Sequence, residues 1–233
     1  VQVTIDNGNT WDNVRPNIVG VPQKTWVSRV EASKHKKGRA YVSFDNHRFD
    51  DNKPYVFMTD DYGKSWKNIT SDLPKDYSVY VIKEDYIDEN LLFVGTEKSV
   101  YFTINQGKIW EKLGSNLPSV AIHDLVIHPR DGDLIAGTHG KSIWILDDIS
   151  PLRNLNFNSN KIIPSRESTK WIKINTGRKQ PYFEFRGENP PYGAIINFYS
   201  KTEIKGKITI TNSSESNLYK RDISLNNGLN RFI

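Results

Sequence analysis

The chain has 233 residues, with 32 Lys and Arg against 27 Asp and Glu, and it contains no cysteine. The lack of cysteine excludes a disulfide framework, a thiolate metal site and a cysteine nucleophile, and no apolar run reaches the ~18–20 residues that a membrane-spanning helix needs. Aromatic residues make up 12% of the chain, among them six Trp and eleven Tyr, which is enough to build a core.

The secondary-structure signal is β from one end of the chain to the other. Short runs rich in Val, Ile, Tyr and Phe alternate with clusters of Gly, Asp, Asn and Pro, the pattern of strands and turns. No stretch holds the 3.6-residue periodicity of a helix over a dozen positions. In chain order, the predicted strands are residues 2–5, 10–14, 27–32, 39–44, 55–59, 65–69, 78–83, 91–95, 100–103, 108–113, 122–127, 134–138, 143–146, 194–198, 207–211 and 218–223.

A repeated turn organises the first 150 residues. Residues 4–11, 59–66 and 103–110 align, and their tryptophans lie 55 and 44 residues apart, a spacing that suits the four-stranded blades of a β-propeller. In each copy an Asp or Asn side chain accepts hydrogen bonds from backbone N–H groups, and a Gly provides the positive φ of a tight turn. The residues assigned to these structural turns are Asp6, Gly8, Trp11, Asp61, Gly63, Trp66, Asn105, Gly107 and Trp110.

The pattern Ser/Thr-x-Asp-x-Gly-x-Thr/Ser-Trp is the Asp-box, also called the bacterial neuraminidase (BNR) repeat. The third copy is degenerate, because Asn105 replaces Asp and Ile109 replaces Ser/Thr. Counting strands between the boxes predicts half a blade, two complete blades and a third blade without its fourth strand. At ~40–50 residues per blade this cannot close a ring of six to eight blades. We therefore expect a fragment whose remaining blades come from upstream sequence or a second chain.

Segments 26–30, 53–55, 59–66, 91–97 and 137–148 together resemble the large secreted bacterial BNR-repeat "glycosyl hydrolase" proteins. Their propeller is similar to the sortilin-type propeller and to that of xyloglucanases. The resemblance continues more weakly through residues 185–194. It implies an extracytoplasmic location, which is secreted, periplasmic or on the cell surface. It also implies that an immunoglobulin-like β-sandwich follows the propeller, with residues 228–232 at the start of one of its late strands.

The balance of charge also changes near residue 150. Residues 1–150 hold 18 Lys and Arg against 21 Asp and Glu, a balance of −3, whereas residues 151–233 hold 14 against 6, a balance of +8. We therefore predict an all-β protein with three parts. Residues 1–150 form about three C-terminal blades of an Asp-box β-propeller, residues 151–178 a linker, and residues 179–233 an incomplete immunoglobulin-like β-sandwich.

Strand parity predicts which face of the propeller carries a site. The loop between the third and fourth strands of a blade (loop 3→4) holds the Asp-box. The loop between the second and third strands (2→3) and the loop from the fourth strand to the next blade (4→1) therefore lie at the opposite face, where the resemblance implies that ligands bind. The candidate residues of this ligand face are Asp45, His47, Arg48, Asp50, Asp51, Glu97, His139, Lys141 and Trp26. Asp50, Asp51 and Asn52 also offer oxygen ligands for Ca²⁺, but the EF-hand spacing is absent, so we expect no metal and no cofactor.

Two functions remain open at this level. The first is a non-catalytic module that binds carbohydrate or protein or acts as a scaffold, with a polysaccharide, glycan or peptide as ligand. The alternative is a sialidase-like or xyloglucanase-like glycoside hydrolase whose catalytic carboxylates lie partly outside the chain, and no residue is assigned as catalytic. Sialidases need an arginine triad, and residues 1–150 offer only Arg15, Arg29, Arg39, Arg48 and Arg130. The lysines are scattered rather than clustered, so we expect no nucleic-acid partner.

Overall fold

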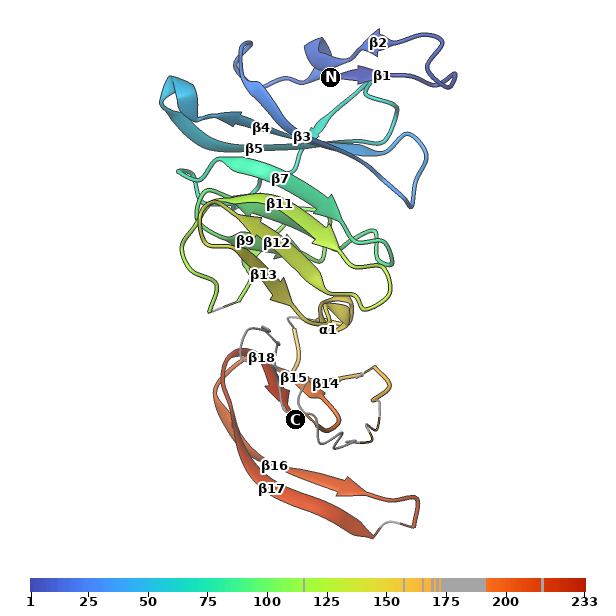
Figure 1. The fold of residues 1–233 in the computed structure, drawn as a ribbon, viewed down its shortest axis with the longest axis vertical. Coiled ribbons are helices and arrows are strands. Elements are labelled where there is room, and N and C mark those ends of the chain that lie inside the picture. Colours follow the sequence, from blue (N-terminus) through green and yellow to red (C-terminus); the bar gives the residue numbers. More distant parts are fainter. Residues whose placement is uncertain are drawn as a thin grey trace, which may run out of the picture. The chain divides into compact units, whose positions relative to one another are not determined.

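The computed structural model describes residues 1–114, 116–156, 158–164, 166–168, 170, 172, 192–214 and 216–233. The chain divides into two units, Val1–Arg153 and Asn154–Ile233, which Figure 1 draws in blue to yellow and in orange to red. Much of the predicted linker, the start of the predicted sandwich and the resemblance at residues 185–191 lie outside the described residues.

The first unit consists of four small antiparallel sheets that follow one another in sequence order (Figure 1). They resemble partial propeller blades, which confirms the all-β prediction. The half-blade holds β1 (Gln2–Val3) and β2 (Asp12–Asn13), and blade one holds β3 (Trp26–Ala32), β4 (Ala40–Asn46), β5 (Asp51–Thr59) and β6 (Lys67–Asn68). Blade two holds β7 (Val79–Glu84), β8 (Leu92–Thr96), β9 (Val100–Thr103) and β10 (Glu111–Lys112), and blade three holds β11 (Ile122–Ile127), β12 (Leu134–Thr138) and β13 (Ile143–Leu146). Short helices lie at Arg15–Asn17, His47–Phe49 and Ser150–Arg153.

The core of this unit lies between the blades. Tyr41 of blade one and Trp110 of blade two belong to one buried cluster that joins these two sheets. A second cluster joins the segment after the half-blade to blade one, and in it the rings of Phe44 and Phe57 meet edge to face at 6.1 Å. Each blade is therefore stabilised chiefly by its neighbours, at about 1.5–3 kcal/mol for each large apolar side chain buried.

The Asp-box turns have the predicted hydrogen bonding. In the second box, Thr59 Oγ1 donates to Asp61 Oδ1 at 2.8 Å and accepts the Gly63 N–H at 2.9 Å. Asp61 accepts from the Ser65 hydroxyl at 2.6 Å and from the Ser65 N–H at 2.9 Å, and these bonds lower the pKa of Asp61 to about 2. Two consecutive residues have positive φ, 60° at Tyr62 and 81° at Gly63. The first box repeats this geometry with Thr4, Asp6 and Thr10, and the third uses Thr103 and Asn105.

Each complete blade rests its Asp-box on the blade before it. A Cβ added to Gly63 would lie 2.9 Å from Val14, and one added to Gly107 would lie 2.9 Å from Ile69, so only glycine allows this approach. The amide of Asn17 reinforces the contact by donating to the Gly63 carbonyl at 2.8 Å. The box of the half-blade has no such neighbour among the described residues.

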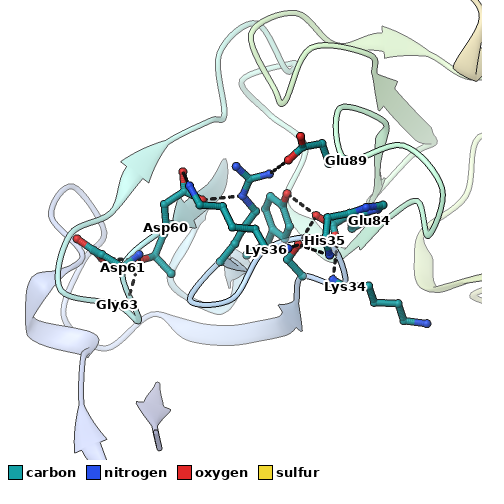
Figure 2. Close-up of polar contacts among 12 residues, drawn as sticks. Lys34, His35, Lys36, Asp60, Asp61, Gly63, Glu84 and Glu89 are labelled. Carbon is teal, nitrogen blue, oxygen red and sulfur yellow. Dashed lines mark hydrogen bonds and ion pairs between the residues drawn. The ribbon is translucent and has the colours of Figure 1, made fainter.

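A buried polar network ties blade one to blade two at the Asp-box face (Figure 2). Glu84 accepts hydrogen bonds from the Ser33 hydroxyl at 2.8 Å, the Lys34 N–H at 2.9 Å and the Tyr41 hydroxyl at 2.8 Å. Beside it, the buried Arg39 binds Asp60 and Glu89 at 2.6 Å each, and the hydrogen bond to Asp60 raises the pKa of Arg39. The network therefore couples the loops of two blades through charge-assisted hydrogen bonds.

The second unit contains two separate small sheets. In chain order its strands are β14 (Lys161–Ile163), β15 (Ile196–Ser200), β16 (Ile204–Thr211), β17 (Asn217–Leu225) and β18 (Gly228–Phe232). One sheet has the order β14-β15-β18 and the other is the β16–β17 hairpin. Strand β14 lies within the residues predicted as linker. It pairs with β15, and its residue Ile163 is buried. The described strands do not show the predicted immunoglobulin-like sandwich, which stays a prediction.

Candidate functional site

A β-bulge recurs at the same place in every first strand. The pairing shifts register at Ser28 in β3, at Tyr80 in β7 and at His123 in β11. A fourth shift, at Asp45 near the end of β4, lies at the same end of the blades. Bulges turn a side chain out of the regular alternation of a strand and are frequent next to binding sites. All four lie at the loop 2→3 and 4→1 face, opposite the Asp-box turns.

Two of these bulges, at Tyr80 and His123, carry members of a set of four rings from three blades that contact one another in succession. The rings of Tyr80 and His123 are stacked with their centroids 4.5 Å apart and an interplanar angle of 24°. His139 lies 5.5 Å from His123 on one side, and His47 meets the edge of Tyr80 at 6.3 Å on the other. We call this set the His–Tyr row (His47, Tyr80, His123 and His139).

Nearby carboxylates affect two members of the row, His47 by a direct contact and Tyr80 through their charge. Asp45 Oδ2 lies 2.6 Å from His47 Nδ1, which favours the tautomer protonated at Nδ1 and leaves Nε2 for a ligand. Burial, together with the negative charges of Asp45 and Glu97, raises the pKa of Tyr80 to about 12. The Tyr80 hydroxyl therefore stays protonated at neutral pH and is available as a hydrogen-bond donor.

An exposed tryptophan lies on blade one opposite Asp45, whose carboxylate contacts His47. Trp26 pairs with Asp45 across β3 and β4, and its side chain is 58% exposed. The guanidinium of Arg48 lies 5.1 Å from the centroid of the Trp26 ring. Such cation–π contacts are worth about 0.5–1 kcal/mol at exposed sites, so this pair keeps an aromatic face and a positive charge side by side.

Asp51, another residue of the predicted ligand face, has a structural role in the described part of the chain. Its carboxylate accepts from the Asn46 amide at 2.9 Å and from the Tyr55 hydroxyl at 2.7 Å. Burial alone would raise the pKa of Asp51, but these hydrogen bonds outweigh it and lower the pKa. The Asp51 carboxylate therefore stabilises the loop between β4 and β5.

The remaining candidates are placed by backbone contacts. Asp50 ends the short helix His47–Phe49 with a φ of 56°. The Glu97 N–H donates to the Ser78 carbonyl at 3.0 Å, and the Lys141 carbonyl accepts the Trp144 indole N–H at 2.9 Å. Across the described residues, no three His, Asp or Glu side chains are arranged to share a metal ion. No helix among the described residues has the length and apolar character to cross a membrane.

The sequence reasoning missed Tyr80 and His123 as members of one site. A signal was available in the repeat itself, because both residues come second in the first strand of their blade. The bulge that reorients them has no sequence signature in the alternation pattern.

Comparison with protein families places most of the chain in one of them. The Sortilin-Vps10 model, described as Sortilin, neurotensin receptor 3, matches residues 54–228. No curated protein matches the chain.

Several solved structures are similar to parts of the chain. An ancestral GH74 enzyme is 12% identical with a TM-score of 0.49, and the match covers 95% of this chain and 30% of that one. The GH74 xyloglucanase from Xanthomonas campestris is 16% identical with a TM-score of 0.45, covering 58% and 22%. YCF48 bound to a D1 peptide is 17% identical with a TM-score of 0.43, covering 84% and 56%. The chain thus spans about a fifth to just over half of these proteins.

Proposed function

The chain belongs to the Sortilin-Vps10 family, and we propose that its blades form a non-catalytic binding module of an extracytoplasmic protein, with the His–Tyr row as the ligand contact. The remaining blades of the propeller come from further sequence of the same protein or from a second chain. This proposal rests on one observation. Four rings contributed by three blades contact one another in succession at the face opposite the Asp-boxes.

A succession of rings from three blades suits an extended ligand, and we propose a glycan chain in preference to a protein. Sugar rings carry an apolar C–H face that stacks on aromatic rings and a rim of hydroxyl groups. Tyr80, His123 and the exposed Trp26 provide ring faces, while His47 Nε2 and the Tyr80 hydroxyl provide an acceptor and a donor. A few placed polar groups among apolar surfaces are typical of ligand sites.

The glycoside-hydrolase alternative has less support. A general acid needs a carboxyl group with a raised pKa, facing a second carboxylate at ~5–10 Å. The Asp45 carboxylate is engaged by His47, and the pKa of Asp51 is lowered by its hydrogen bonds. If the alternative holds, the protein that contains these blades releases reducing sugar from a soluble polysaccharide.

The binding proposal is tested with a panel of cello-oligosaccharides, xyloglucan oligosaccharides and extended peptides, titrated into the chain by calorimetry. We expect His123→Ala to weaken binding of an oligosaccharide about tenfold, the loss of roughly one stacking contact of ~1.4 kcal/mol. His128→Ala is the matched control, because His128 follows the same strand but lies outside the row. If only the peptides bind tightly, the ligand is a protein and not a glycan. Equal oligosaccharide affinity of wild type and His123→Ala would contradict the proposed site.

A further inference from the structure

Blades one, two and three each present one Lys or Arg in their loop 2→3. These residues are Arg48 in blade one, Lys98 in blade two and Lys141 in blade three, and all three are exposed. Asp50 and Glu97 belong to the same loops, yet no carboxylate of the described residues lies within ion-pair distance of any of the three cations. The face that carries the His–Tyr row therefore offers three positive charges that no described acidic residue neutralises.

In the two complete blades, an aromatic ring at the entry to the first strand holds this cation. The Lys98 ammonium lies 4.7 Å from the centroid of the Tyr77 ring, just before β7, as the Arg48 guanidinium lies 5.1 Å from that of Trp26 at the start of β3. Tyr77 packs against the buried cluster between the blades, which fixes its ring. A cation that is already held in place loses less side-chain entropy when it binds an anion. We call these two contacts the aromatic–cation pairs.

Buried hydroxyl groups beside the aromatic–cation pairs lack hydrogen-bond partners. Among the described residues four buried polar side-chain atoms have no partner, and three of them are the hydroxyls of Thr25, Ser78 and Ser99. Each of these residues is the sequence neighbour of a member of an aromatic–cation pair. Buried polar groups without a partner are rare, and water molecules that bridge to a bound ligand would satisfy them. This observation is independent of the charges and points to a ligand at the same place.

The row itself is unsuited to a negative charge. Asp45 Oδ2 lies 2.6 Å from His47 Nδ1, and the charges of Asp45 and Glu97 both raise the pKa of Tyr80. The same charges would repel a carboxylate placed on these rings. An anionic group of the ligand therefore belongs at the cations and not at the row.

We propose that the glycan is a uronic-acid polysaccharide, whose carboxylates pair with Arg48, Lys98 and Lys141 while its sugar rings contact the row. This class of ligand rests on the glycan binding proposed above and specifies it further. One cation on each of three successive blades suits a polymer that repeats its charge along the chain. Arg48 can also bind a carboxylate through two parallel N–H donors.

The test compares two oligosaccharides of the same length and linkage, a cello-oligosaccharide and the glucuronate oligomer in which carboxylates replace its hydroxymethyl groups. Each is titrated into the full chain by calorimetry. We expect the glucuronate oligomer to bind about tenfold more tightly at low salt, because three exposed ion pairs each add a small free energy. This advantage should shrink at about 0.5 M NaCl, where exposed charges are screened.

Single substitutions locate the anion. Arg48→Gln and Lys98→Gln should each reduce the ratio of the two affinities about threefold. Lys64→Gln is the matched control, because it removes the same charge from the second Asp-box at the opposite face and should leave the ratio as in the wild type. His123→Ala should weaken both oligomers to the same extent, since the row contacts the sugar rings of either one.

The outcomes separate this assignment from the function on which it rests. Equal affinity for the two oligomers, both weakened by His123→Ala, would overturn the uronate assignment and leave the glycan site in place. A glucuronate advantage that survives the combined Arg48→Gln and Lys98→Gln substitutions would also overturn it, because the carboxylates would then bind elsewhere. If neither oligomer binds, or His123→Ala changes neither affinity, the proposed function and the uronate assignment fail together.

Discussion

At the scale of single residues, the Asp-box carboxylate makes the fold sensitive to acid. The pKa of Asp61 is about 2 in the folded chain, below its ordinary 3.8, because Ser65 and Thr59 donate to it. A carboxyl group with a lowered folded pKa stabilises the fold above its unfolded pKa, and this stabilisation is lost as the pH falls toward 2. The melting temperature of the wild type should therefore drop between about pH 4 and pH 2.

Asp61→Asn tests this directly, since the third box already uses an amide at that position, Asn105. We expect the variant to lose less melting temperature between pH 4 and pH 2 than the wild type does, measured by circular dichroism. The reciprocal Asn105→Asp should steepen the acid transition. If the melting temperatures of all three chains fell equally between pH 4 and pH 2, protonation of the Asp-box carboxylate would not be what destabilises the fold in acid.

The buried carboxylate of Glu84 is the second sensitive residue. It accepts from three donors, and Glu84→Leu leaves all three without this acceptor, at about 1–3 kcal/mol for the buried Tyr41 hydroxyl and less for each of the two partly buried bonds. We expect a loss of about 3–5 kcal/mol in the free energy of unfolding by urea, and a smaller loss for Glu84→Gln. Glu89→Leu is the control: Glu89 is partly exposed and Arg39 keeps Asp60, so the expected loss is about 0–1 kcal/mol.

At the scale of elements, the packing of one blade on the next depends on glycine. Ala at any Asp-box glycine is strained, because φ is positive at all three positions, at a cost of about 1–2 kcal/mol. Gly107→Ala adds a clash with the Ile69 backbone carbonyl, Gly63→Ala a clash with the Val14 side chain, and Gly8→Ala neither. The loss of unfolding free energy should therefore rise from Gly8 through Gly63 to Gly107. Equal losses of unfolding free energy would mean that the Asp-boxes do not pack against the neighbouring blade.

The blades could be predicted from the sequence because their signals are local. A Thr, an Asp or Asn, a Gly and a Trp at fixed offsets specify a turn, and alternating apolar runs on either side specify strands. The bulges at Tyr80 and His123 could not, because register depends on pairing with a strand far along the chain. His47 and His139 were placed on the predicted ligand face by the order of strands and loops, whereas their contact with Tyr80 and His123 depends on the bulges and could not be predicted.

At the scale of the whole molecule, repetition produces both the stability and the proposed binding face. Blades two and three bring Tyr80 and His123 to the same end at the bulges of their first strands, and the loop after β4 of blade one adds His47, so three blades contribute to the row. The Asp-boxes and the Glu84 network stabilise the opposite face (Figure 2). Substitutions at the Asp-box face should therefore lower stability without changing the affinity for a ligand held at the row.

The most direct measurement of the central claim uses the five histidines of the chain, of which three lie in the row and two, His35 and His128, lie outside it. The ring proton resonances are assigned by substitution and followed by NMR as the tightest-binding oligosaccharide of the panel is added. We expect the resonances of His47, His123 and His139 to shift together with one Kd, while those of His35 and His128 stay in place. Saturable binding that leaves the three row histidines unshifted would contradict it.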